Sequence, residues 1–332
     1  ASLAHDIGNP PFGHSGEKAI GEYFSHGNGK RFKNQLSEKE FQDLVKFEGN
    51  ANGFKILTEN RPGIEGGLRL SYATLGAFMK YPKESLPHKP TANIGDKKFG
   101  IFEDVAQELG LQQIRKGNEI AYSRHPLAFL VEAADDICYT IIDFEDGINL
   151  GLIDEEYALE YLIKLVKNNI NTSKYNQLTN TADRLAYLRA LAINTLITEA
   201  ADIFLKNEEA ILKGEFHESL FDKSSYEAQI KDIIKISVEN IYQSEEVISK
   251  EIAGYSMLSY LLDIYTKAFL PQENHQDSNF TKLVLKSVPK LKGLEEKASV
   301  YEKLISICSY TASLTDGMTV ASFKKYSGLE IN

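Results

Sequence analysis

The chain has few of the cysteines whose disulfides stabilise small proteins, and none of the long apolar runs that span membranes. Its 332 residues include no tryptophan and only two cysteines, Cys138 and Cys308. Two cysteines cannot build a disulfide framework and lack the spacing of zinc ligands, so we expect buried free thiols. No apolar run approaches the roughly 18 residues that a membrane-spanning helix needs, and a signal-peptide pattern is lacking. These absences predict a cytoplasmic protein that has no membrane contact.

Positive charge is also scarce. Lys and Arg number 37 against 47 Asp and Glu, which leaves a formal net charge of −10. Such a balance argues against a general binder of nucleic acid or of anionic membranes. With 42% hydrophobic and 25% charged residues the composition is that of an ordinary globular protein with ample core. The length allows one large or two medium domains.

The most informative stretch is residues 2–17, SLAHDIGNPPFGHSGE. An adjacent pair, His5 and Asp6, is followed by a Pro- and Gly-rich turn, then by His14 and, three residues later, Glu17. Imidazole beside carboxylate suits a divalent cation, which can polarise a phosphoryl oxygen. The prolines predict a rigid turn, and a helix that begins near residue 15 would place His14 and Glu17 together at its start. An isolated His-Asp pair is weak evidence for a metal.

A second informative stretch covers residues 124–143, with Pro126 at a position that suits the first turn of a helix. An apolar stripe at helical spacing is expected to be buried: Leu127, Leu130, Val131, Ala134, Cys138 and Ile141. Asp135, Tyr139 and Asp143 recur every four residues, so they share one face of that helix. Two interpretations are open: a functional cluster, or a polar stripe that faces solvent.

Residues 47–57, FEGNANGFKIL, predict a helix of unusual composition. Two glycines and two asparagines make a poor helix interior, so something other than helix propensity must account for them. Close approach of another backbone or of a ligand is one explanation, and a tolerated kink is the other. Elsewhere Ser37 and Glu40 have the spacing of a capping box, and Lys116-Gly117-Asn118 predicts the turn of a small hairpin. Beyond Gly151 the pattern is helical almost throughout.

Together these strings resemble the deoxyguanosinetriphosphate triphosphohydrolase-like (dGTPase-like) family of HD-domain phosphohydrolases. Residues 5–17 are similar to the family's HD-x-G-x-x-P-F-G-H-x-G-E, and residues 47–53 to F-E-G-N-A-x-G. Residues 124–143 resemble R-x-P-L…E-A-A-D-D-I-x-Y…D, and residues 67–82 also have a counterpart. A faint likeness to D-Y-I-x-G-M-T-D ends at Thr315-Asp316, but three other positions nearby depart from it, so we transfer no role to that segment.

The resemblance implies an all-α HD-domain helical bundle with a C-terminal helical extension and at most a small β-hairpin. We place the catalytic core in residues 1–150 and the extension in residues 151–332. The implied reaction is metal-dependent hydrolysis of a deoxynucleoside triphosphate, dGTP or a related dNTP, to the deoxynucleoside and tripolyphosphate. The implied partners are that substrate, other copies of the chain in a homo-oligomer, and a nucleotide effector.

The resemblance also implies roles for individual residues. His5, Asp6 and Asp135 would hold a divalent metal, Mg²⁺ or Mn²⁺. His14 would act as acid and base, with Glu17 to orient it, because a carboxylate fixes the tautomer of an imidazole and raises its basicity. Tyr139 and Asp143 would contact the deoxyribose. The remaining candidates for substrate binding are Asn9, Glu48 and Asn50.

The family's metal pattern is H…HD…D, and its first His lies upstream of the pair. Only four residues precede His5, none of them His, and residue 1 is Ala. We therefore expect either a processed or truncated piece or a three-ligand site that binds metal more weakly. The missing ligand keeps an alternative open: a nucleotide-binding regulatory or inactive protein of the same fold. A third alternative is an HD phosphohydrolase that acts on other phosphoesters.

Overall fold

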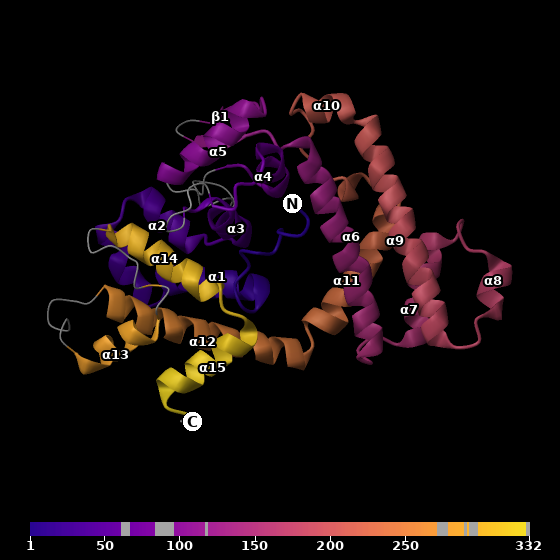
Figure 1. The fold of residues 1–332 in the computed structure, drawn as a ribbon. Coiled ribbons are helices and arrows are strands. Elements are labelled where there is room, and N and C mark those ends of the chain that lie inside the picture. Colours follow the sequence, from indigo (N-terminus) through magenta and orange to yellow (C-terminus); the bar gives the residue numbers. More distant parts are fainter. Residues whose placement is uncertain are drawn as a thin grey trace. The chain divides into compact units, whose positions relative to one another are not determined.

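The computed structural model describes residues 1–60, 67–83, 96–116, 119–270, 278–288, 291 and 298–329. Helices make up almost all of the regular structure in these ranges (Figure 1). Strands β1 (Gln113–Lys116) and β2 (Glu119–Tyr122) pair antiparallel, and the intervening Gly117 and Asn118 lie outside the described residues. The predicted all-α fold with a small hairpin is confirmed.

The chain forms two compact units. Unit 1 comprises Ala1–Tyr122 and Lys250–Asn332, and unit 2 comprises Ser123–Ser249. This division does not coincide with the split that we predicted at residue 150. The long helix α6 (Pro126–Asn149) packs against α9 (Thr181–Lys206), so its residues group with the helices that follow it in the chain. The C-terminal segment, in turn, groups with the N-terminal one.

Unit 1 contains two hydrophobic clusters. Its elements besides the hairpin are α1 (Gly13–Ser25), η1 (Asn28–Gln35), α2 (Glu38–Val45), α3 (Gly49–Thr58), α4 (Tyr72–Phe78), α5 (Asp96–Glu108), most of α12 (Glu245–Phe269), α13 (Asn279–Ser287), α14 (Val300–Ala312) and α15 (Asp316–Ser327). One cluster joins α1 and α2 to α12 and α14, with Phe24 and Tyr265 fully buried. The other joins α3, α4 and α5 around Phe54 and Phe102, whose rings meet edge to face.

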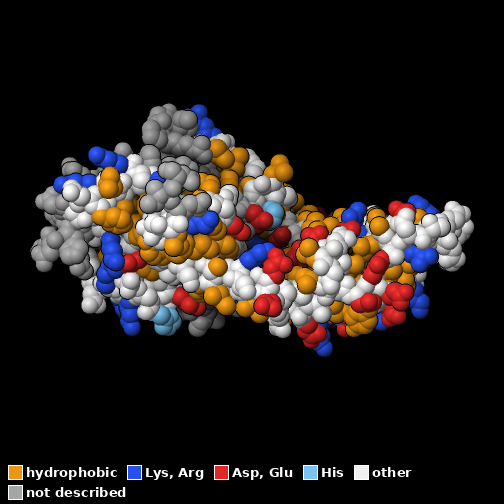
Figure 2. All heavy atoms as spheres, turned by 90° about the horizontal axis from the view of Figure 1, so that it is seen from below, with side chains coloured by type: hydrophobic (Ala, Val, Ile, Leu, Met, Phe, Trp, Pro, Cys, Tyr) orange, Lys and Arg blue, Asp and Glu red, His pale blue; other side chains and the backbone are white. Residues whose placement is uncertain are grey.

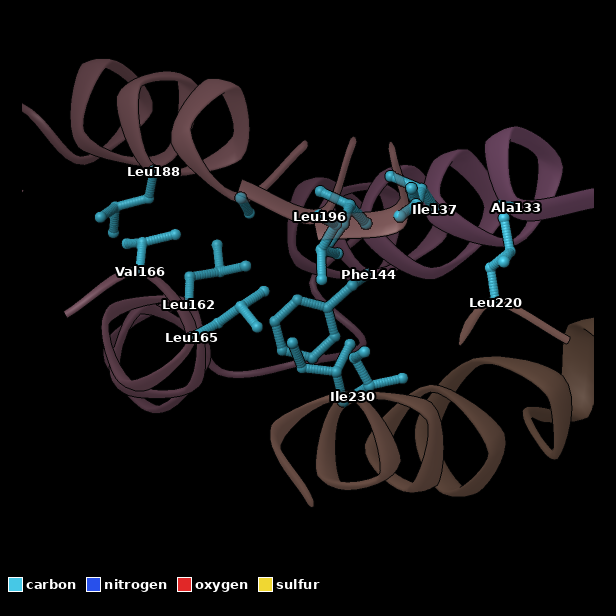
Figure 3. Close-up of a cluster of buried hydrophobic side chains, with 14 of the residues drawn as sticks. Ala133, Ile137, Phe144, Leu162, Leu165, Val166, Leu188, Leu196, Leu220 and Ile230 are labelled. Carbon is cyan, nitrogen blue, oxygen red and sulfur yellow. The ribbon is translucent and has the colours of Figure 1, made fainter. Parts of the chain in front are cut away.

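Unit 2 has a single hydrophobic cluster. Its elements besides α6 and α9 are α7 (Glu155–Val166), α8 (Thr172–Gln177), α10 (Glu208–Leu212), η2 (Phe221–Lys223), α11 (Glu227–Ser237) and the π-helical turn η3 (Val238–Tyr242). Phe144 of α6 is fully buried and points toward Leu165 of α7 and Ile230 of α11 (Figure 3). Packing of α7 and α11 onto this ring fixes the rotation of α6 and hence the face that it exposes.

Some local signals in the sequence predicted the structure correctly, and others did not. Ser37 and Glu40 form the predicted capping box at the start of α2, and Pro126 is the first residue of α6. The predicted apolar stripe of α6 was largely wrong, because Leu127, Ala134 and Cys138 are exposed and only Ile141 of its members is fully buried. Both cysteines are free as expected, but only Cys308 is buried. The buried side is the row Phe129, Ala133, Ile137, Ile141 and Phe144, which shares only Ile141 with the predicted stripe. Apolar residues occur all round this helix, so periodicity alone did not select the side that packs.

The described helices include none that is both long and apolar enough to cross a membrane. On the face shown in Figure 2, acidic, basic and hydrophobic side chains are interspersed. The described residues of that face form no extended basic area, which agrees with the net negative charge.

Candidate functional site

The His-Asp pair lies in a series of tight turns before α1. The Nδ1–H of His5 donates to the Ser2 carbonyl at 2.7 Å, which fixes the position of that proton. His5 Nε2 lies 3.1 Å from Asp6 Oδ2, and Asp6 Oδ1 accepts a hydrogen bond from Asn9 Nδ2 at 2.7 Å. The backbone turns, with the Asn9 N–H bonded to the Asp6 carbonyl at 3.0 Å, hold the three side chains together.

These two side chains fit a divalent cation. A metal-ligating His characteristically donates its other N–H to a backbone carbonyl, as His5 does to Ser2. Two ligands at about 2.1 Å from an octahedral ion lie about 3 Å apart, and His5 Nε2 and Asp6 Oδ2 are separated by 3.1 Å. Nitrogen and carboxylate oxygen together suit the transition-metal end of the series, with Mn²⁺ included, better than Ca²⁺.

His14 and Glu17 are brought together in the first turn of α1, as their spacing predicted. His14 Nδ1 lies 3.0 Å from Glu17 Oε2, and the other carboxylate oxygen, Oε1, accepts the Gly49 N–H at 2.6 Å. The His14 side chain is 89% exposed while that of Glu17 is 16% exposed. A partly buried, backbone-anchored carboxylate therefore holds one nitrogen of a ring that is otherwise open to a substrate.

The Glu17 carboxylate also sets the charge of His14. The hydrogen bond from His14 to Glu17 is the main cause that raises the pKa of His14 above its usual value, and the Coulomb attraction of Glu17 adds to it. Loss of hydration around the imidazole opposes this shift. Because Nδ1 must carry the proton that it shares with a carboxylate, Nε2 is the nitrogen that can give or take a proton.

Close packing against other parts of the chain accounts for the two glycines of the 47–57 segment. A methyl group on Gly49 would lie 2.2 Å from Asn9 Oδ1, and one on Gly53 would lie 2.7 Å from Cζ of Phe78. A methyl group on Gly8 would lie 2.1 Å from both the Gly49 carbonyl oxygen and the Gly53 nitrogen. The buried Asn52 adds a hydrogen bond from its Nδ2 to the Gly8 carbonyl at 2.9 Å. The loop that carries the His-Asp pair is thus seated directly on α3.

Glu48 and Asn50 have structural partners of their own. Glu48 is the N-cap of α3, and its carboxylate accepts the Ala51 N–H at 2.9 Å and Asn50 Nδ2 at 2.7 Å. Burial is the main cause that raises the pKa of Glu48. Capping accounts for these residue types without a ligand, and their role in substrate binding stays a prediction.

In unit 2 the exposed face of α6 carries an aromatic and an acid. The Tyr139 ring is 49% exposed and stacks on the ring of Tyr242, with centroids 5.7 Å apart and planes 11° from parallel. Tyr242 donates its hydroxyl to Asp143 Oδ2 at 2.5 Å. Burial is the main cause that raises the pKa of Asp143, and the Tyr242 hydrogen bond works against it. Tyr139 and Asp143 thus form one cluster with Tyr242, and whether it is functional stays a prediction.

Sequence inspection missed Tyr242. It ends the π-helical turn η3, and π turns occur frequently at functional sites. Nothing in the pattern of residues 238–242 marks such a turn, so only the stacking partner identifies it.

Asp135 lies on α6 in unit 2, whereas His5 and Asp6 belong to unit 1. Within the described part of the chain, no group of three or more His, Cys, Asp or Glu side chains is arranged to hold a metal ion. The three-residue metal set therefore stays a prediction.

Comparison with known proteins gives these geometries a context. A deoxyguanosinetriphosphate triphosphohydrolase-like protein of Synechocystis is 34% identical over 346 residues, which cover 100% of this chain and 77% of the relative. The chain belongs to the dGTPase-like family. A like-named protein of Pseudomonas aeruginosa is 33% identical over 99% of this chain and 76% of its own length. A deoxyguanosinetriphosphate triphosphohydrolase of Klebsiella pneumoniae is 31% identical over 80% of this chain and 60% of its own length.

No protein-family model matches the chain. Membership of the dGTPase-like family thus rests on whole-chain identity to these relatives and agrees with the resemblance seen in the short strings.

Proposed function

We propose that this protein hydrolyses a deoxynucleoside triphosphate, dGTP or a related dNTP, to the deoxynucleoside and tripolyphosphate in a metal-dependent reaction. The observation that carries the proposal is the chain of contacts from Gly49 N–H through the Glu17 carboxylate to the exposed ring of His14. The names of the relatives support the substrate class.

Formation of these products breaks one bond, between the α-phosphorus and the 5′ oxygen, as water adds to phosphorus. The departing 5′ oxygen is strongly basic and needs a proton. Glu17 raises the pKa of His14, and this favours the protonated ring that can supply the proton. With Nδ1 held by Glu17, Nε2 delivers the proton to the leaving oxygen, and the neutral ring can later recover one from water.

By the family resemblance, His5, Asp6 and Asp135 would hold the divalent metal, which would supply positive charge at the phosphoryl oxygens. Asn9 orients Asp6 through the hydrogen bond to Oδ1, which leaves Oδ2 directed toward His5 Nε2. The turn that joins these residues positions two donors before any ion arrives, which lowers the entropic cost of binding.

Tyr139, Asp143 and Tyr242 form the proposed contact surface for the deoxyribose. The stacked rings give a flat apolar edge against which a sugar can pack, and Asp143 Oδ1 can accept a hydrogen bond from a sugar hydroxyl while Oδ2 holds Tyr242. A bulky ring beside the sugar would favour deoxyribose over ribose by leaving little room for a second hydroxyl.

A panel of dNTPs with Mg²⁺, Mn²⁺ or a chelator tests the proposal, with products resolved by ion-exchange chromatography. We expect metal-dependent release of tripolyphosphate and deoxynucleoside, with the ribonucleotide cleaved more slowly. Release of phosphate or pyrophosphate would contradict the reaction proposed. Nucleotide binding without turnover would instead favour a regulatory protein of this fold.

The expected homo-oligomer and nucleotide effector belong to the same proposal. Light scattering with and without a second dNTP measures the oligomer, and the rate with the first dNTP as a function of the second measures the effector. A single species with the mass of a monomer would contradict the homo-oligomer. A rate that does not change when the second dNTP is added would contradict the effector.

A further inference from the structure

Phe12, two residues before His14, has an unusual backbone. Its φ of 65° and ψ of 20° lie in the left-handed region, where a side chain with a Cβ is disfavoured. Phe12 is the N-cap of α1, but its side chain makes no capping hydrogen bond. A conformation of this kind persists only where surrounding structure enforces it.

The C-terminal segment supplies one constraint. The Phe12 N–H donates to Asp316 Oδ1 at 2.9 Å, across 304 residues of sequence. Asp316 is the first residue of α15 and directly follows the N-cap residue Thr315. A backbone amide bonded to a carboxylate is a strong, directional contact, and it defines where Phe12 sits.

Helix α12 supplies the second and third constraints. A methyl group at Gly254 would lie 2.7 Å from Cγ and Cδ2 of Phe12, so the ring rests on the bare backbone of this helix. One turn earlier on α12, Glu251 accepts the Ser15 hydroxyl at 2.6 Å, and Ser15 is buried. His14 is therefore held between two residues, Phe12 and Ser15, that are both attached to the C-terminal half of unit 1.

We propose that Asp316 is a positioning residue for His14, acting through the Phe12 backbone with Gly254 as the seat of the Phe12 ring. This inference rests on the proposed function only for its kinetic readout. It assigns a role to a segment for which the family likeness was too faint to transfer one. The loop that carries His14 is thus held in position by Gly254 and Asp316, which lie far along the chain from it.

The test compares Asp316→Ala, Gly254→Ala and Asp316→Asn in the full chain. We expect the first two to lower kcat about 10- to 100-fold with little change in KM, because displacement of a catalytic group by about 1 Å has effects of that size. Asparagine keeps an oxygen at Oδ1, so Asp316→Asn is expected to stay close to wild type. Ser299→Ala, which removes the N-cap of α14 away from this loop, is the matched control for lost helix stability.

An NMR titration of the His14 ring provides a readout that needs no turnover, with the signal assigned by its loss in His14→Gln. In Asp316→Ala and Gly254→Ala the midpoint is expected to fall toward that of an ordinary histidine, because the contact with Glu17 loosens. Wild-type titration and kcat in Asp316→Ala, or the same losses in Ser299→Ala, would overturn the inference. If no variant and no wild-type sample hydrolyses a dNTP, the proposed function fails and the His14 titration alone decides this inference.

Discussion

The two candidate clusters are assembled in opposite ways. In unit 1 the pairs Asp6–Asn9 and His14–Glu17 are each three residues apart. The Gly49 N–H holds Glu17, and the Ser2 carbonyl holds His5, the neighbour of Asp6. In unit 2 Tyr139 and Asp143 sit a turn apart on one long helix, and their partner Tyr242 is 99 residues beyond Asp143. Short-range, backbone-anchored contacts restrict motion tightly, which suits proton transfer, whereas a helix face with a stacked partner suits binding.

Asp135 is the residue that most directly breaks this division, since it lies in unit 2 yet is proposed to hold the metal with His5 and Asp6. Asp135→Ala is expected to abolish Mn²⁺ binding in calorimetry and to remove activity, while circular dichroism stays helical. Asp136→Ala is the matched control and is expected to retain the metal. The reverse pattern would show that Asp136 is the ligand.

His14→Ala tests whether the unit 1 cluster performs the chemistry. We expect kcat to fall about 10²- to 10⁴-fold, the usual contribution of a general acid, with KM nearly unchanged. His26→Ala is the control, because His26 is the C-cap at the opposite end of α1 and its side chain is hydrogen-bonded to that of Ser25. A large change in KM with unchanged kcat would show that His14 binds substrate, and it would contradict a catalytic role for the unit 1 cluster.

Tyr242→Phe tests the binding role of the unit 2 cluster. Phenylalanine keeps the stacked ring but removes the hydroxyl that donates to Asp143, so KM is expected to rise about 10-fold at constant kcat, the loss expected for a hydrogen bond to a charged group. Tyr157→Phe, which removes a hydroxyl bonded to Tyr161 on α7, is the control. A fall in kcat alone would assign the cluster to catalysis.

Glu17→Gln gives the smallest expected effect, on stability. Glu17 raises the pKa of His14 in the folded state. The stabilisation of the fold by this ion pair is therefore fully present below the pKa of His14 in the unfolded chain, and it is lost as pH rises through the pKa of His14 in the folded protein. The variant should therefore lose about 1–2 °C more in Tm at about pH 5.5 than at about pH 8.5, a small difference because His14 is exposed. Glutamine can still accept the Gly49 N–H, which keeps the acidic and basic measurements comparable. An equal loss at both pH values would show that the ion pair adds nothing.

Local features of the fold were predictable where the cause is local. The Ser37–Glu40 capping box, the first position of Pro126 and the hairpin depend on residues within a few positions of each other. The buried side of α6 was not predictable, because α7, α9 and α11 select it through Phe144 and its neighbours. The same holds for Gly49 and Gly53 of α3, where an added methyl group would meet the distant Asn9 and Phe78.

Residue types and spacings alone were enough for the helical class, the family, and the pairing of His14 with Glu17, since a separation of three on a helix brings two side chains together. Only the tertiary structure joined Tyr242 to Asp143, Gly8 to Gly49 and Phe12 to Asp316. Each of these contacts spans tens to hundreds of residues. No local propensity encodes such a contact; it exists because the packed helices of each unit bring those residues to the same place.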